Sequence, residues 1–199
     1  TSKNILKPIS KSAIIKKLLH FTVFVIMGCA IVYGQNRISY DIDAALDSVG
    51  KSLTISQKIS FEGISNKKLD TLYFTDWPNA YSGINTPLAQ RFVEEYDRSF
   101  YLSNKTKFGN TSIQSFTING TQADWSRLDN KPDIIQVISS QKINNEKITK
   151  IEIQYEVVLP DAKFTGYGYN DEGDIYLRYW YIAVSPIFED KWQNYSHLN

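Results

Sequence analysis

The sequence has almost none of the residues from which metal centres and disulfide frameworks are built. Its 199 residues include a single cysteine, Cys29, and two histidines, His20 and His197. A catalytic zinc site usually takes three protein ligands, commonly histidines, and no His-Glu-x-x-His pair occurs here. A single cysteine cannot form a disulfide within the chain, so a hydrophobic core has to stabilise the fold. These absences exclude a conventional zinc centre and a disulfide-bonded scaffold.

The sequence patterns of nucleophilic and phosphate chemistry are missing as well. No Gly-x-Ser-x-Gly elbow occurs, and Gly166 and Gly168 lack the third glycine and the Lys-Ser/Thr pair of a phosphate-binding loop. Residues 170–174 offer carboxylates that would suit calcium, but Asn-Asp-Glu-Gly is typical of a tight turn between strands. We therefore predict that this chain carries no catalytic residue, no metal ligand and no cofactor of its own.

The first 34 residues have the composition of an export signal. Lys16 and Lys17 precede the uncharged residues 18–33, and a small glycine follows them. A basic start, an apolar middle and a small-residue end form the layout of a secretory signal peptide. Sixteen uncharged residues are fewer than the roughly 20 that span a bilayer. We expect residues 1–34 to form an apolar signal helix, with a retained membrane anchor as the rival and lipid attachment at Cys29 as a further alternative.

The charge of the remaining chain argues against one class of partner. Five of the 22 basic residues and none of the 21 acidic residues precede residue 35, so the rest of the chain carries a net charge of −4. Nucleic-acid binding requires a concentrated basic surface. We expect no nucleic-acid partner, an exported location (periplasmic, cell-surface or secreted), and contact with a membrane only through the leader.

From Arg37 onward, apolar and polar residues alternate with the period of two that is typical of β-strands. Residues 52–61 place four apolar side chains and one amide on a single face: Leu53, Ile55, Gln57, Ile59 and Phe61. Other candidate strands lie within residues 38–46, 71–77, 111–118, 133–140 and 150–160. The pattern predicts one all-β unit over residues 35–199, with seven to nine antiparallel strands in a sandwich or a saddle.

One segment has the period of a helix instead. Thr86 is a candidate N-cap and Pro87 suits the first helical position. Apolar residues follow at spacings of four: Leu88, Phe92, Tyr96 and Phe100. This stripe predicts a short helix over residues 86–101, inserted between strands, with its charged residues on a solvated face.

Residues 164–182 hold seven aromatic side chains in nineteen residues. We predict a hairpin with arms at 164–169 and 174–184 around a turn at 170–173. In the second arm, alternation places Leu177 and Tyr179 on a core face.

The opposite face of that arm carries Tyr176, Arg178 and Trp180. We select these three as contacts to a neighbouring domain or to a substrate cleft, because Tyr and Trp serve at surfaces that are apolar at one end and polar at the other. The alternative is a ligand platform on which Tyr176 and Trp180 grip a glycan.

Several phrases of the chain resemble the start of exported bacterial members of the aminopeptidase N family, in the variant found in flavobacteria-like proteins. They are "YDIDAAL", "SLTISQKISFEGISN", "LDTLYFTDWPNAY", "KITKIEIQYEVVLPDAKFTGYGY" and "LRYWYIAVSPIFEDKWQNYSHLN". Together they cover roughly residues 37–199. This family consists of zinc metallopeptidases of the gluzincin group.

The resemblance implies a saddle-like β domain that packs against a thermolysin-like catalytic domain. In the family, that later domain carries the zinc ligands and removes amino-terminal residues from peptides. None of its motifs occurs here, so no catalytic or metal residue is carried over, and zinc is expected only in the missing domain. We therefore expect a non-catalytic, incomplete amino-terminal part of a zinc aminopeptidase; the alternative is a stand-alone secreted β-sandwich that binds a glycan or a protein.

Overall fold

The computed structural model describes residues 38–64, 69–143 and 147–196. The expected signal or anchor helix over residues 1–34 lies outside this part of the chain. Within it, no helix has both the length and the apolar character that crossing a bilayer would need. These residues all belong to one compact unit.

The first sheet has five strands in the order β1-β2-β8-β4-β5. Their bounds are β1 Ile38–Asp47, β2 Ser52–Phe61, β8 Thr149–Val158, β4 Asn110–Ile118 and β5 Thr121–Gln122. All four pairings are antiparallel. The register places Leu53 between Leu46 of β1 and Val157 of β8, so the apolar rows of neighbouring strands lie on one face.

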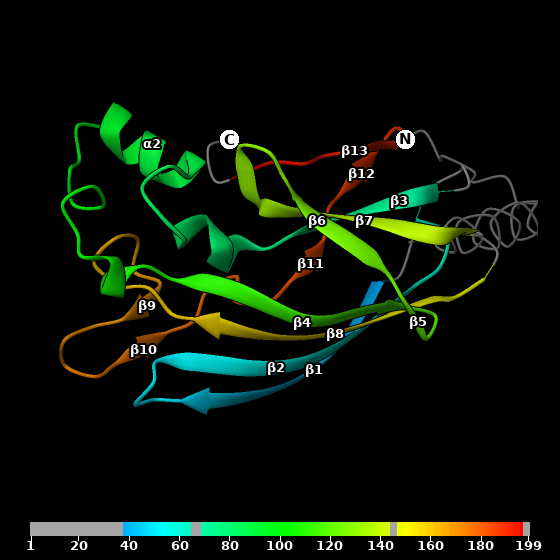
Figure 1. Ribbon diagram of the computed structural model, residues 1–199, viewed down its shortest axis with the longest axis horizontal. Coiled ribbons are helices and arrows are strands. Elements are labelled where there is room, and N and C mark those ends of the chain that lie inside the picture. The colour runs from blue at the N-terminus through cyan, green and yellow to red at the C-terminus, as the bar shows by residue number, and fades with distance from the viewer. Residues whose placement is uncertain (1–37, 65–68, 144–146, 197–199) are drawn as a thin grey trace, which may run out of the picture. The chain divides into compact units, whose positions relative to one another are not determined.

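The second sheet has four strands in the order β11-β3-β7-β6. Their bounds are β11 Ala183–Val184, β3 Leu69–Thr75, β7 Lys131–Ile143 and β6 Asp124–Leu128. Two small hairpins accompany the sheets: β9 Gly168–Tyr169 with β10 Ile175–Tyr176, and β12 Ile187–Phe188 with β13 Lys191–Trp192. The two main sheets form separate layers (Figure 1), which confirms the predicted all-β sandwich.

The hydrophobic core lies between these two layers. Phe74 of β3 and Phe116 of β4 are fully buried and meet edge to face, with ring centroids 5.2 Å apart. Each large apolar side chain buried in this way stabilises the fold by roughly 1.5–3 kcal/mol. The predicted inner face of β2 is confirmed: Leu53, Ile55, Ile59 and Phe61 are all buried, and so is the amide of Gln57.

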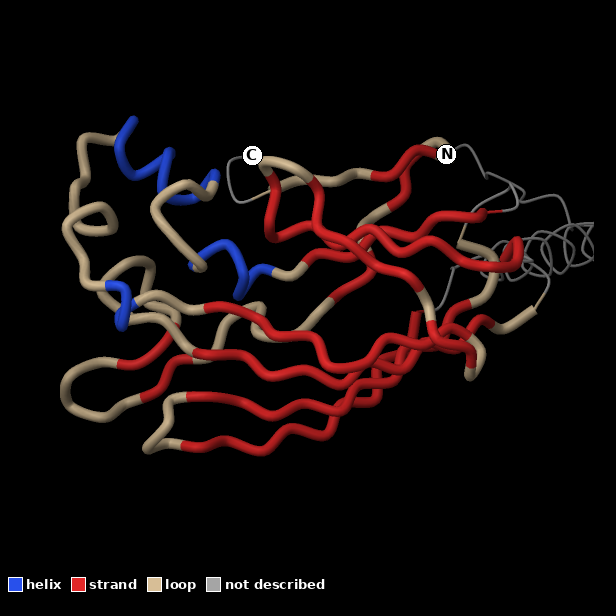
Figure 2. The backbone as a smooth tube through the Cα atoms, in the orientation of Figure 1, coloured by secondary structure: helices blue, strands red, loops and turns tan. Residues whose placement is uncertain are grey.

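The helical segments are 3-10 helix η1 Trp77–Tyr81, α-helix α2 Pro87–Glu94 and 3-10 helix η2 Lys105–Lys107. Figure 2 shows them in blue at one end of the sandwich. The predicted start of α2 is confirmed, because Thr86 Oγ1 accepts a hydrogen bond from the Ala89 N–H.

The predicted end of α2, residue 101, is wrong. The helix stops at Glu94 because Tyr96 adopts φ of 62°, a left-handed conformation that no α-helix contains. Tyr96 is 95% exposed instead of lying on the apolar stripe. Phe100 does reach the core, but it does so from an irregular segment.

The aromatic hairpin is also shorter than the alternation predicts. Its turn is confirmed, since Asn170 Oδ1 accepts hydrogen bonds from the N–H groups of Glu172 and Asp174. Only two residue pairs form between the arms, and the chain then leaves the ladder. The predicted core face is wrong, because Leu177 and Tyr179 are exposed while Ile182, from the opposite face, is fully buried.

Candidate functional site

A buried ion pair fixes the chain where β3 ends. The Asp76 carboxylate is fully buried and lies 2.7 Å from Arg127 Nη2, the guanidinium of β6. It also accepts a hydrogen bond of 2.7 Å from the Thr111 hydroxyl at the start of β4. Burial raises the pKa of Asp76, and the charge of Arg127 and the Thr111 hydrogen bond oppose that rise. The pair ties β3, β4 and β6 together at one point.

The next turn of chain, η1, is held by an amide. Asn79 donates to the Pro132 carbonyl oxygen at 2.7 Å and accepts from the Thr111 N–H at 3.1 Å. Asn79 is itself buried, so both hydrogen bonds are shielded from water. The sequence phrase Asp-Trp-Pro-Asn-Ala-Tyr is therefore a structural anchor, and it fixes the positions of the flanking rings of Trp77 and Tyr81.

A pocket of about 330 Å³ opens between η1, α2 and residues 164–179. We call it the α2 pocket. Most of its lining is aromatic, with two guanidinium groups and one carboxylate at its sides: Trp77, Tyr81, Leu88, Arg91, Phe92, Glu95, Phe164, Thr165, Tyr167, Arg178 and Tyr179. The Trp77 and Tyr179 rings lie 5.8 Å apart with 34° between their planes. The pocket thus offers ring faces together with charged groups.

The charges around the α2 pocket do not cancel. Arg91 Nε lies 2.9 Å from Glu95 Oε1, so this cation has its own counter-ion. Arg178 is exposed and makes no hydrogen bond or ion pair within the described ranges. The lining therefore carries one positive charge without a local carboxylate partner.

The wall beside Arg178 is polar. The Tyr81 hydroxyl and the Thr165 hydroxyl lie 2.6 Å apart and share a hydrogen bond. Burial raises the pKa of Tyr81, although the Thr165 hydrogen bond and the charge of Arg178 oppose the rise. Tyr81 therefore stays neutral at physiological pH and can donate or accept a hydrogen bond.

A buried amide anchors the aromatic segment to the first sheet. Gln57 Nε2 donates to the Ile182 carbonyl oxygen at 2.6 Å, and its Oε1 accepts from the Tyr155 hydroxyl. The Ile182 N–H completes the triangle by donating to the Tyr155 hydroxyl at 3.2 Å. Burial raises the pKa of Tyr155 far above its usual value, so this hydroxyl is neutral. Polar groups of an otherwise apolar core thus hold residue 182 in place.

The three residues selected from the sequence lie in three different surroundings. Tyr176 is half exposed and borders a second pocket with Lys107 and Asp161. Arg178 borders the α2 pocket. Trp180 is partly buried and packs against the hydrophobic core, with its ring 5.6 Å from Tyr181.

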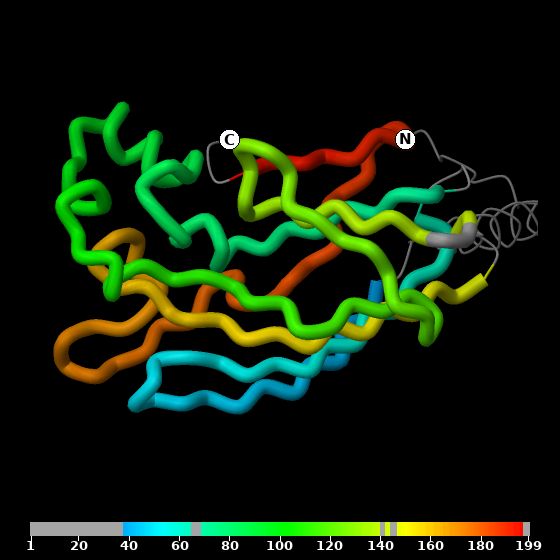
Figure 3. The backbone as a smooth tube through the Cα atoms, viewed as in Figure 1, coloured from blue at the N-terminus to red at the C-terminus, as the bar shows by residue number. Residues whose placement is uncertain are grey.

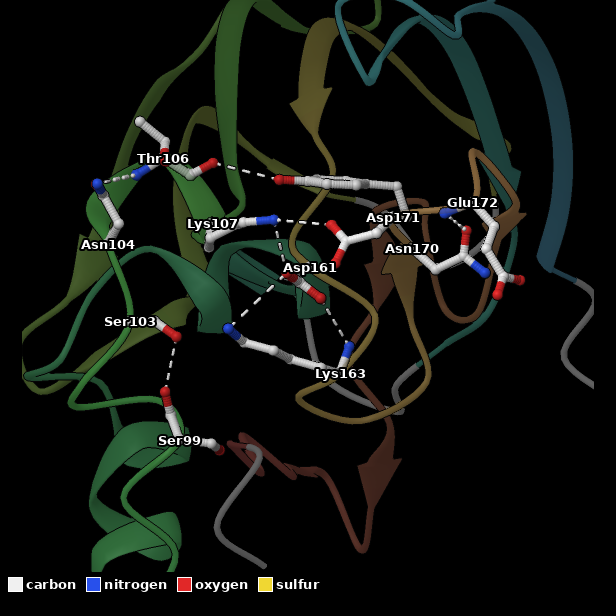
Figure 4. Close-up of polar contacts among 11 residues, drawn as sticks. Ser99, Ser103, Asn104, Thr106, Lys107, Asp161, Lys163, Asn170, Asp171 and Glu172 are labelled. Carbon is white, nitrogen blue, oxygen red and sulfur yellow. Dashed lines mark hydrogen bonds and ion pairs between the residues drawn. The ribbon is translucent and has the colours of Figure 1, made fainter.

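The second pocket contains a chain of opposite charges (Figure 4). Lys107 Nζ lies 3.0 Å from Asp161 Oδ2 and 3.4 Å from Asp171 Oδ1, and Lys163 Nζ lies 3.9 Å from Asp161. Lys51 and Lys107 also sit over the Tyr169 ring, at 3.6 and 5.4 Å from its centroid. Each charge has an opposite charge or a ring nearby, so this cluster fastens η2 to residues 161–171.

The first strand exposes an apolar row. Ile38, Tyr40, Ile42, Ala44 and Leu46 pair with β2 residues that are all buried on the same face of the sheet. In β1 that row is exposed or only partly covered, and Leu46 is 50% exposed. Figure 3 shows β1, in blue, at the outer edge of its sheet. The row extends the core surface beyond the area that the second sheet covers.

The aromatic segment meets one end of this row. The Tyr40 hydroxyl accepts a hydrogen bond of 3.1 Å from the Val184 N–H. The Tyr40 ring contacts Tyr181 edge to face at 5.6 Å. We call the surface formed by the β1 row and Tyr181 the β1 surface.

Residues 38–64, 69–143 and 147–196 contain no candidate metal-binding site. No three of their His, Cys, Asp and Glu side chains lie close enough together to hold an ion. Within residues 170–174, the Asp174 carboxylate accepts a hydrogen bond from the Asn170 side-chain amide, and the Asp171 carboxylate pairs with Lys107.

Several residues of the two surfaces were not selected from the sequence. Trp77 falls at the end of the candidate strand 71–77, but β3 ends at Thr75 and Trp77 is the first residue of η1, so alternation does not determine its position. Arg91 and Glu95 were assigned to a solvated helix face, and they do lie at the surface, but they also border the α2 pocket. Their spacing of four is the one signal that could have paired them.

Comparison with known proteins assigns no family to the chain. No family model matches the chain, and no curated protein sequence matches it. The solved structures that are similar include a two-domain M1 zinc metallopeptidase mutant bound to L-arginine, at 9% identity with a TM-score of 0.39. The match covers 63% of this chain and 22% of that one. A likeness at this level does not establish a family or an activity for this chain.

Proposed function

We propose that this chain is the non-catalytic amino-terminal module of an exported zinc aminopeptidase, and that it packs against the catalytic domain and helps to shape its cleft. The phrases quoted from residues 37–199 support the family, and the β-sandwich is compatible with the module that the resemblance implies. Zinc and the peptide substrate would belong to the catalytic domain.

The observation that carries this proposal is the exposed apolar row of β1. A long edge strand with apolar side chains open to water is a site of aggregation unless another element covers it. The β1 row belongs to the face that is buried in β2, so a covering element would extend an existing core. The resemblance to aminopeptidases implies that this covering element is a neighbouring domain of the same polypeptide.

The alternative, glycan binding by Tyr176 and Trp180, has less support. A sugar platform requires two exposed rings that face the same ligand, whereas Trp180 packs against the core and Tyr176 borders the charged second pocket.

Sequencing and assaying the complete polypeptide encoded by the gene would test this function. We expect a His-Glu-x-x-His motif beyond residue 199, and hydrolysis of alanine p-nitroanilide that stops when a chelator removes zinc. The 199-residue chain alone, supplied with zinc, should give no hydrolysis. Peptidase activity of the chain alone, or a complete polypeptide without the motif, would overturn the proposal.

A further inference from the structure

We propose that the α2 pocket binds a small ligand that consists of a six-membered ring bearing a carboxylate. This inference is independent of the proposed packing against a catalytic domain, because the pocket and the β1 surface have no residue in common.

The size and walls of the α2 pocket suit one ring. Ligand pockets usually measure about 300–1,000 Å³, and this one, at about 330 Å³, lies at the small end of that range. Trp77 and Tyr179 both line the pocket and pack against each other, with centroids 5.8 Å apart and 34° between their planes, so a ligand ring would pack against this pair and not between its rings. A flat or chair-shaped ring packs well against such faces.

The charge of the pocket selects an anion. Arg91 is neutralised by Glu95, whereas Arg178 has no counter-ion among the described residues. A guanidinium binds a carboxylate with two parallel hydrogen bonds, which makes it a specific partner for this group. The neighbouring Tyr81 and Thr165 hydroxyls can bind the remaining polar atoms of the ligand.

The backbone at the pocket is also unusual. Tyr179 adopts φ of 50°, a left-handed conformation that costs free energy for any residue other than glycine, asparagine or aspartate. This conformation places a 66%-exposed ring at the pocket rather than in the core. The fold thus holds an aromatic side chain in a strained position where a ligand could use it.

Two acids test the proposal and show whether the pocket prefers a sugar ring or an aromatic ring. D-glucuronate provides a sugar ring with a carboxylate, and 4-hydroxybenzoate provides an aromatic one. Each would be titrated into the 199-residue chain while tryptophan fluorescence and heat are recorded, with glucose and phenol as uncharged controls. We expect saturable binding of at least one acid, weaker binding at high salt, and no saturation with the controls.

Variants assign the binding to the pocket. Arg178→Gln should lower the affinity about tenfold, since a hydrogen-bonded charge is lost, whereas Arg98→Gln, at an exposed arginine outside the pocket, should change nothing. Tyr179→Gly should lower the affinity without lowering the melting temperature, because glycine accepts the left-handed backbone. No saturation with either acid, equal binding of acids and controls, or unchanged affinity in both pocket variants would overturn the proposal.

Discussion

Arg127 and Asp76 meet inside the protein, with the guanidinium nitrogen 2.7 Å from a fully buried carboxylate oxygen. Arg127 also donates to the Pro132 carbonyl oxygen at 2.6 Å, so it bridges β6, the end of β3 and the start of β7. Sequence patterns did not select either residue. The pair anchors the chain between the end of β3 and η1, next to Trp77 of the α2 pocket.

Arg127→Met should destabilise the protein by about 3 kcal/mol, because it leaves a buried carboxylate without its cation. Adding Asp76→Asn should recover part of that loss, since the uncompensated charge is then removed. Urea unfolding measures both changes, and Arg98→Met, at an exposed site, serves as the control with an expected change within about 0.5 kcal/mol. A single variant as stable as the wild type would show that the pair contributes nothing.

Gln57→Leu should cost about 2 kcal/mol, because the Tyr155 hydroxyl and the Ile182 carbonyl oxygen lose their buried partner. Amide exchange of residues 177–182 should become faster as their anchor is lost. Gln154→Leu, on the exposed face of the neighbouring strand β8, is the matched control. Equal exchange rates in the two variants would contradict the role assigned to Gln57.

Asp161 should make stability sensitive to acid. Burial alone would raise its pKa, but hydrogen bonds from the Lys163 N–H and from Lys107, with the charges of both lysines, lower it below the ordinary value of 3.8. A carboxyl group whose pKa is lower in the folded state than in the unfolded state stabilises the folded protein. This stabilisation is complete at a pH above the unfolded-state pKa, and it is lost as the pH falls through the folded-state pKa.

Asp161→Asn should therefore lower stability at neutral pH by about 1–2 kcal/mol and flatten the acid limb of the stability profile. Asp171→Asn is the control, because its side chain is 93% exposed although it contacts the same Lys107. Unfolding curves between pH 2 and pH 7 provide the measurement. Parallel acid limbs in the wild type and Asp161→Asn would refute the assignment.

Tyr96→Gly should stabilise the protein by about 1 kcal/mol. Tyr96 lies two residues beyond α2 with φ of 62°, and glycine adopts this conformation at no steric cost. Tyr101→Gly, at an exposed tyrosine with a negative φ, should be neutral or destabilising. Thermal unfolding distinguishes the two, and a lower melting temperature for Tyr96→Gly would contradict the explanation of where α2 ends.

The fold could be predicted where burial follows the period of the backbone. The alternation of residues 52–61 correctly placed even the polar Gln57 inside, because one face of β2 is buried along its whole length. Alternation failed at Leu177 and Tyr179, where the chain leaves the ladder after two residue pairs and periodicity no longer determines burial. The helical spacing of four failed at Tyr96, because a left-handed residue at a helix end is usually marked by glycine rather than tyrosine.

The candidate site was less predictable than the fold. Arg178 was selected, but the prediction placed it with Tyr176 and Trp180, whereas its neighbours at the α2 pocket include residues of η1 and α2, far away in the sequence. Such a pocket depends on tertiary contacts, and no spacing within one segment encodes them.

Crosslinking from the β1 surface tests the central claim most directly. A photo-reactive amino acid would replace Ala44, an exposed member of the row, within the complete polypeptide encoded by the gene. We predict crosslinks from this position to the domain that carries the zinc-binding motif, and none from the control position Thr54 on the opposite, exposed face of β2. Crosslinks confined to residues 1–37, or to other copies of the same strand, would contradict the account.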